Sequence, residues 1–125
     1  MSPDPEIPLA KVRDAALALP STTEKPSHGS PGFFVEGGAA FAYFWHDHHG
    51  DGETVAIVKT TGLDEQQMLI EGDPAFYYAP PYLGPSGWVA MRLDGEDMDW
   101  DRVADRIAIS GELAAPRRLL EAGGR

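Results

Sequence analysis

Residues 33–60, FFVEGGAAFAYFWHDHHGDGETVAIVKT, decide the fold. Residues 33–35, 39–45 and 54–60 are rich in aromatic and β-branched residues, which is typical of strands. A Glu-Gly-Gly turn at 36–38 separates the first two segments, and an Asp-Gly pair precedes the third. Asp-Gly is a strong hairpin signal because both residues tolerate the positive φ angles of tight turns. The stretch therefore predicts three consecutive antiparallel strands.

A helix precedes these strands. Residues 9–19 place apolar residues at helical spacing, and Pro20 closes the pattern. Residues 21–32 are dense in Ser, Thr, Pro and Gly, so we expect turns around a short extended piece there. The helical residues expected to face the core are Val12, Ala15, Ala16 and Leu19.

A second helix and two more strands are expected after residue 60. Asp64 can cap a short helix that runs to Ile70, with Leu63, Met68 and Leu69 as its core contacts. Gly72 and Pro74 follow and end it. Residues 76–78 and 88–93 predict strands on either side of a loop stiffened by three prolines.

A last helix is predicted from Asp99, which is a suitable N-cap. Its apolar stripe would contain Trp100, Val103, Ile107 and Leu113, and residues 116–121 form a separate short helix. The predicted order is helix, three strands, helix, two strands, helix. This order favours an α+β fold of two layers, in which a mostly antiparallel five-stranded sheet carries its helices on one face.

Length and composition predict one domain over residues 9–125, preceded by a disordered lead over residues 1–8. The chain has no cysteine, which excludes disulfides, thiolate zinc sites and a cysteine nucleophile and fits a cytoplasmic location. No apolar run reaches the ~20 residues that span a bilayer, so no membrane association is expected. The net charge of −10 repels phosphate backbones at long range and lowers the expectation of DNA binding.

Histidines make the first candidate site. His46 and His48 would share one face of a strand, and imidazoles spaced in this way can bind a divalent metal. The segment runs into a turn, however, so a solvated hairpin tip is the preferred interpretation, and no cofactor is predicted. His28, flanked by Ser27 and Ser30, invites a general-base role, but Gly29 beside it favours a sharp turn.

Aromatic residues are concentrated around one loop. Phe76, Tyr77, Tyr78, Tyr82 and Trp88 lie in or beside the proline-rich segment. Most of them are expected in the core, while one or two can line an exposed groove for a ligand or a protein partner. The groove candidates are His28, Tyr82 and Trp88.

Arginines make the last candidate site. Arg102 and Arg106 lie four residues apart on the last helix, and Arg117 and Arg118 follow. Together with Arg92 or Lys59 they could form a phosphate-facing patch. The alternative is that the helix arginines form surface ion pairs, with Asp101 and Asp105 as partners.

Four short motifs resemble the MmcQ/YjbR family. They are Ser27-His28-Gly29-Ser30-Pro31-Gly32-Phe33, Pro80-Pro81-Tyr82-Leu83-Gly84 followed by Gly87-Trp88-Val89, Asp99-Trp100, and Ala115-Pro116-Arg117-Arg118. The resemblance implies a bacterial two-layer α+β domain similar to type III secretion chaperones. Proteins of this family are commonly labelled as DNA-binding, so the resemblance implies a DNA-binding role. It implies no catalytic residues. Two hypotheses follow: a non-enzymatic DNA-binding domain, or a protein-interaction module with an exposed surface near Tyr82.

Overall fold

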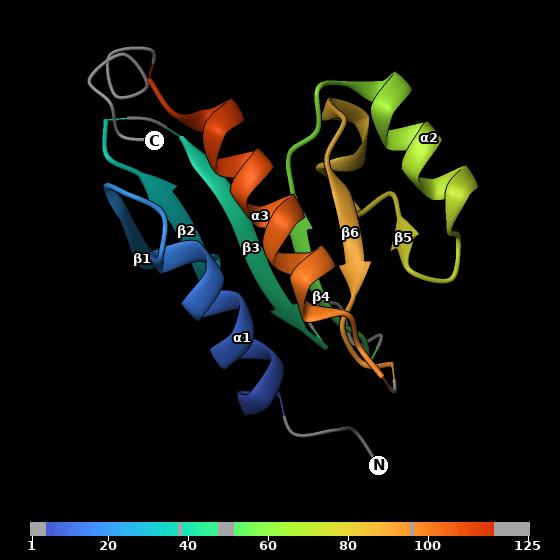
Figure 1. Cartoon of the computed structure of the whole chain (residues 1–125), viewed down its shortest axis with the longest axis horizontal. Helices are drawn as coiled ribbons and strands as arrows, with labels where there is room; N and C mark the ends of the chain where they lie inside the picture. The colour runs from blue at the N-terminus through green and yellow to red at the C-terminus, as the bar shows by residue number, and fades with distance from the viewer. Residues whose placement is uncertain (1–4, 38, 48–51, 96, 117–125) are drawn as a thin grey trace.

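The computed structural model describes residues 5–37, 39–47, 52–95 and 97–116. Its centre is one six-stranded sheet in which every neighbouring pair is antiparallel (Figure 1). The strand order is β1-β2-β3-β4-β6-β5, so β1 and β5 form the two edges. The strands are β1 (Thr22–Ser27), β2 (Ser30–Val35), β3 (Ala40–His46), β4 (Thr54–Val58), β5 (Tyr77–Tyr78) and β6 (Val89–Arg92).

The helices confirm the α+β class and the predicted order of elements. Helices α1 (Glu6–Leu17) and α3 (Trp100–Ala114) pack on each other and lie across one face of the sheet (Figure 1). Helix α2 (Leu63–Gly72) contacts β5 at the far edge, and a 3-10 turn, η1 (Gly84–Ser86), precedes β6. The predicted short helix over residues 116–121 lies almost entirely outside the described residues.

The sheet has one strand more than the five predicted. Strand β1 comes from the Ser, Thr, Pro and Gly-rich segment, where we expected mainly turns. His28 and Gly29 both have positive φ (53° and 83°) and connect β1 to β2 by a two-residue hairpin turn. An edge strand tolerates Pro26 and polar residues because one side of it meets solvent, so its composition resembles that of a loop.

The first helix starts earlier than predicted. It begins at Glu6, so residues 6–8, which we expected in a disordered lead, form its first turn. Pro8 is buried there, in a turn whose amide groups need no helical acceptor. Residues 1–4 lie outside the described part of the chain.

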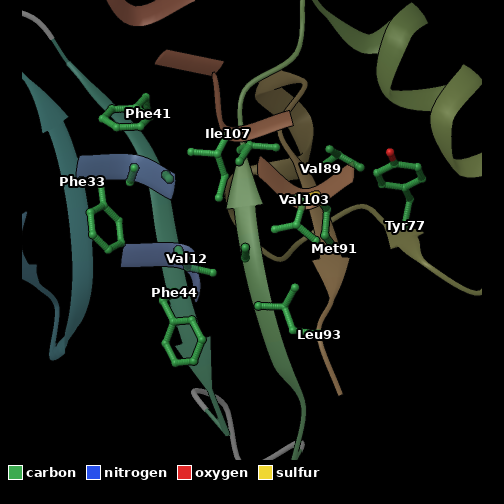
Figure 2. Close-up of a cluster of buried hydrophobic side chains, with 14 of the residues drawn as sticks. Val12, Phe33, Phe41, Phe44, Tyr77, Val89, Met91, Leu93, Val103 and Ile107 are labelled. Atoms are coloured by element: carbon green, nitrogen blue, oxygen red, sulfur yellow. The ribbon is translucent and has the colours of Figure 1, made fainter. Parts of the chain in front are cut away.

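The main core fills the space between the sheet and the helices α1 and α3 (Figure 2). Val12 from α1 and Val103 and Ile107 from α3 meet side chains of β2, β3, β4 and β6 there. The N-cap role of Asp99 is confirmed, because its carboxylate accepts the Arg102 N–H at 3.1 Å. Leu113, however, is exposed, and Ser110 and Gly111 take its place in the core-facing stripe.

Helix α2 differs from the prediction in its N-cap and in its buried face. Asp64 does not cap it; Gly62 occupies the N-cap, and Glu65 accepts the Thr61 N–H at 2.8 Å instead. Leu63 and Met68 are exposed at 56% and 61%, although we expected both to face the core. The buried residue is the polar Gln66, with Leu69 and Ile70 half-buried beside the core.

Ser110 fastens α3 to the sheet. The pairing of β3 with β4 ends at Ala42 and Val58, and Phe41 and Lys59 are the next residues along the two strands. The buried Ser110 hydroxyl bridges them, because it accepts the Lys59 N–H at 2.8 Å and donates to the Phe41 carbonyl. One side chain of α3 thereby satisfies two backbone groups of the sheet.

We predict that Ser110→Ala lowers the free energy of unfolding by about 1–3 kcal/mol, because the buried Phe41 carbonyl and the half-buried Lys59 N–H both lose the Ser110 hydroxyl. Urea denaturation followed by circular dichroism measures the change. Ser86→Ala, at an exposed position of η1, is the matched control and should change stability by less than about 0.5 kcal/mol. Equal stability of the two variants would contradict the role given to Ser110.

Candidate functional site

The sheet has a second apolar layer on the face that points away from α1 and α3, which we call the open face. Alternation along the strands sends Val55, Ile57 and Ala90 to this face, where they form a buried floor. Strand residues, together with Leu83 and Trp88 from the 79–88 loop, pack on this floor, and no side chain of a described helix belongs to the layer. The side chains around the floor are Tyr43, Trp45, Tyr78, Leu83 and Trp88.

Strand register arranges these side chains in rows. One row crosses all six strands and contains Lys25, Gly32, Tyr43, Ile57, Ala90 and Tyr78. The next row contains Trp45, Val55 and Arg92. Gly32 leaves room for the neighbouring Phe34 ring, since a Cβ atom at Gly32 would lie 3.1 Å from it.

Three cations on this face lie over aromatic rings. The Lys59 ammonium is 4.9 Å from the centre of the Trp88 ring, and the Arg92 guanidinium is 4.5 Å from that of Tyr78. The Lys25 ammonium lies 5.3 Å from the centre of the Phe34 ring. A cation held over a ring gains about 0.5–1 kcal/mol at exposed sites and still reaches solvent.

Acidic residues are nearly absent from the sheet. The six strands contain one acid, Glu24, which faces α1 and forms a bidentate pair with Arg13 at 2.6 and 2.9 Å. The hydrogen bond from Arg13 lowers the pKa of Glu24 below its ordinary value. Glu53, just before β4, pairs with Arg92 at 3.4 Å. The open face is therefore basic and aromatic in a protein whose net charge is −10.

Gln66 and Thr60 hold the loop that carries Trp88. The buried Gln66 amide donates to the carbonyls of Gly84 and Trp88 at 2.8 and 2.6 Å. Thr60 donates to the Gly87 carbonyl at 2.6 Å, and Gly87 (φ 92°) approaches Gly62 so closely that a Cβ atom would lie 3.1 Å away. The start of α2 thereby fixes the position of Trp88 on the open face.

We predict that Gln66→Leu, which keeps the size of the side chain, lowers the free energy of unfolding by about 1–3 kcal/mol, because the Trp88 carbonyl loses the Gln66 amide and the Gly84 carbonyl keeps only the Gly87 N–H among the described donors. Gln67→Leu is the matched control, since Gln67 is exposed and bonds only along its own helix to Glu71. Thermal and urea unfolding measure both variants. If Gln66→Leu unfolds like the control, the loop is held by other contacts.

The groove candidates from the sequence lie far apart. His28 is exposed at the tip of the β1–β2 hairpin, on one edge of the sheet. Trp88 is buried on the open face near the other edge, and Tyr82 is 82% exposed in the loop before it. The structure therefore brings Trp88 into the candidate site and separates it from His28, which serves the turn.

The proposed metal ligands gain no support. His46 shares a hydrogen bond of 2.7 Å with Thr54 through Nδ1. His48 lies outside the described residues, and within the described ones no group of three potential ligands exists.

The helix arginines form ion pairs, but not with Asp101 or Asp105, the partners expected from the sequence. Arg102 pairs with Asp73 at 3.0 Å and stacks on Phe76, and Arg106 lies 3.7 Å from Glu65. The Thr61 N–H, with Arg106 adding to its effect, lowers the pKa of Glu65. Arg117 and Arg118 lie outside the described residues. The patch expected on this helix is therefore neutralised at both of its described members.

The Arg106 guanidinium is only partly paired. Its Nε and Nη2 atoms are buried without a hydrogen-bond partner among the described residues. Because a buried, incompletely paired ion pair is costly, we predict that replacing both charges, Arg106→Met together with Glu65→Gln, leaves stability unchanged or raises it by up to about 2 kcal/mol. Glu65→Gln keeps an oxygen that can accept the Thr61 N–H. Arg102→Met, which breaks a pair with short geometry, should lower stability by about 1 kcal/mol. Urea denaturation of both variants measures this, and a loss above about 2 kcal/mol for the double variant would contradict the argument.

Sequence reasoning missed most of the open face. Lys25, Phe34, Tyr43 and Trp45 were not singled out, although Lys59, Arg92 and Trp88 were considered for other sites. The signal was the run of large side chains at both odd and even positions of residues 39–45, which predicts a strand with two apolar faces. The sequence does not show which side chains pack against each face, because this depends on the pairing of strands that are distant in the chain.

The comparisons with known proteins agree with this fold. The YjbR family matches residues 17–110, which is most of the chain. The chain belongs to the YjbR family. The resemblance expected from the motifs is thereby confirmed, and as a YjbR domain the chain joins a family whose function is uncharacterised.

One solved structure with a similar fold is Deinococcus radiodurans protein DR2400, which contains a DUF419 domain. Its TM-score to this chain is 0.66 at 18% sequence identity, and the similarity covers 84% of this chain and 76% of that one. No curated protein matches the chain. Among the described residues, no helix is long and apolar enough to cross a membrane.

Proposed function

We propose that this YjbR domain is a non-enzymatic nucleic-acid-binding domain and that it binds through the open face of its sheet. Lys25 and Lys59 contact phosphates in this proposal, and the aromatic side chains between them contact the rest of the ligand. The observation that carries it is the separation of charge: Lys25 and Lys59 lie over aromatic rings on a face whose strands present no acid. A DNA-binding role is also what the motif resemblance implied.

The net charge of −10 is compatible with such a face. The exposed acids Asp101 and Asp105 belong to α3, which lies on the opposite side of the sheet. At physiological ionic strength charges are screened over about 8 Å, and packed layers lie about 10 Å apart. The acids therefore slow the approach of a polyanion but act weakly on phosphates already in contact with the open face.

This proposal moves the interface away from the last helix. The guanidinium groups of Arg102 and Arg106 are engaged by Asp73 and Glu65, so a phosphate would have to displace a carboxylate at each. Lys25 and Lys59 instead lie over aromatic rings, which leaves their donors available.

The non-enzymatic part of the proposal rests on the two described histidines. His28 lies at a solvent-exposed turn, and His46 bonds to Thr54. A general base needs an orienting group and an accessible nucleophile, whereas the Thr54 hydroxyl beside His46 belongs to a residue that is 1% exposed. These surroundings favour a structural role for both histidines.

The protein-interaction alternative has less support. Outside the open face, the exposed apolar residues of the described helices form no large patch. Leu63 and Met68 are five residues apart on α2 and point about 140° away from each other. Ile109 and Leu113 make a strip of only two side chains on α3. Tyr82 is the strongest residue for this alternative because of its 82% exposure. One exposed ring is small beside the ~800 Å² that a partner covers in a stable complex.

Fluorescence anisotropy with a labelled oligonucleotide, as a single strand and as a duplex, tests the proposal. Two phosphate contacts predict that affinity falls about 7- to 12-fold between ~50 and ~200 mM salt. Lys25→Gln and Lys59→Gln should each weaken binding about five- to tenfold at ~50 mM salt. Lys11→Gln is the matched control, because it changes the net charge equally at an exposed position of α1.

Two results would contradict the proposal. The first is that neither form of the oligonucleotide binds at ~50 mM salt. The second is that Lys11→Gln weakens binding as much as Lys25→Gln and Lys59→Gln do, because binding would then follow the net charge and not the open face.

A further inference from the structure

We infer that the ligand of the open face is a single strand whose neighbouring bases stack on Tyr43 and Trp45. This inference rests on the proposed function and names its substrate class. Tyr43 and Trp45 lie two residues apart on β3, both face away from the helices, and both are half-buried. They therefore place two half-buried aromatic side chains next to each other on one strand.

The spacing of these rings selects an unstacked chain. Residues two apart on a strand lie about 7 Å from each other. Successive nucleotides along one strand of a duplex are about 3.4 Å apart, which is half that distance. Bases that occupy both rings must therefore separate from each other, which a single strand allows and a base-paired duplex resists.

Both rings are supported from below and from the side. Tyr43 lies opposite Ile57 in the strand register, and Trp45 lies opposite Val55. The Tyr43 ring also packs at a tilt against Trp88, with 5.6 Å between the ring centres. Because this packing already restricts the side chains, a base that stacks on them costs little further conformational entropy.

The cations are placed around these two rings. β1, which carries Lys25, lies two strands from β3 on one side. Two strand spacings are about 10 Å. Lys59 follows β4, the direct neighbour of β3. A strand whose bases lie on Tyr43 and Trp45 can therefore place flanking phosphates near cations on both sides.

A duplex fits this face poorly. Its bases lie inside the grooves, so a sheet face would meet only its phosphate backbones, and Tyr43 and Trp45 would remain without a base to stack on. The aromatic half of the site contributes to affinity only when the bases are free.

The decisive experiment compares an oligothymidylate of about 12 nucleotides, a length within the ~4–16 range of known single-strand sites, with a mixed-sequence duplex. Tyr43→Leu and Trp45→Leu should each weaken single-strand binding about 5- to 100-fold and leave duplex binding unchanged. Tyr43→Phe and Trp45→Phe keep a ring and should retain affinity within about threefold. Circular dichroism checks that each variant is folded.

A second measurement does not depend on the leucine variants. A base stacked on Trp45 should quench its fluorescence, so the quenching seen with the oligothymidylate should fall in Trp45→Phe. The inference is overturned if the duplex binds as tightly as the single strand, or if Trp45→Phe keeps the full quenching. If Lys25→Gln and Lys59→Gln still weaken binding in that case, the proposed function stands without the inference, whereas both fall if no nucleic acid binds.

Discussion

Consecutive side chains of a β-strand point to opposite faces of the sheet, and the central strands of this protein carry large side chains on both. In β3, Phe44 enters the core under the helices while Tyr43 and Trp45 lie on the other face. In β4 the five residues are all buried, with Ala56 and Val58 on one side and Val55 and Ile57 on the other. The core and the candidate site are therefore two faces of the same strands, and a change of register by one residue would exchange them.

The junction between α3 and the sheet connects these two faces. Ser110 satisfies the Lys59 N–H from the helix side, while the Lys59 side chain extends over Trp88 on the open face. Trp88 is held in turn by Gln66, whose amide bonds to its carbonyl. Two polar side chains that belong to helices therefore decide where the cation and the ring of the open face lie. Buried polar contacts of this kind have strict geometry, so they position the site more narrowly than apolar packing does.

The sequence predicts the order of the helices and strands better than it predicts which side chains of each are buried. Gly and Pro mark the turns, and alternation marks the strands, so the order of elements and the N-cap at Asp99 follow from local signals. Strand β1 was missed because an edge strand needs few apolar residues. The buried face of α2 was misassigned because Gln66, a polar residue, is buried by hydrogen bonds to a loop that lies about 20 residues further along the chain.

The open face itself could not be predicted for a related reason. Its rows join residues that are distant in sequence, such as Lys25 with Tyr43 or Val55 with Arg92. No local pattern reports such pairings, because they depend on the register of the assembled sheet. The arginines of the last helix were easier to find, since a spacing of four residues is visible in the sequence, but their partners on and after α2 are not.

The separation of cations from acids has a structural cause. A carboxylate placed among the rings of the open face would lose hydration without gaining a donor, since the aromatic rings there present their negative faces. Cations gain from the same rings, and Lys and Arg can cover apolar surface with their long stems while the charged end reaches water. Aromatic residues on an uncovered sheet face thus favour basic neighbours and disfavour acidic ones. The same two properties, flat rings and available cations, are those that a chain of bases and phosphates requires.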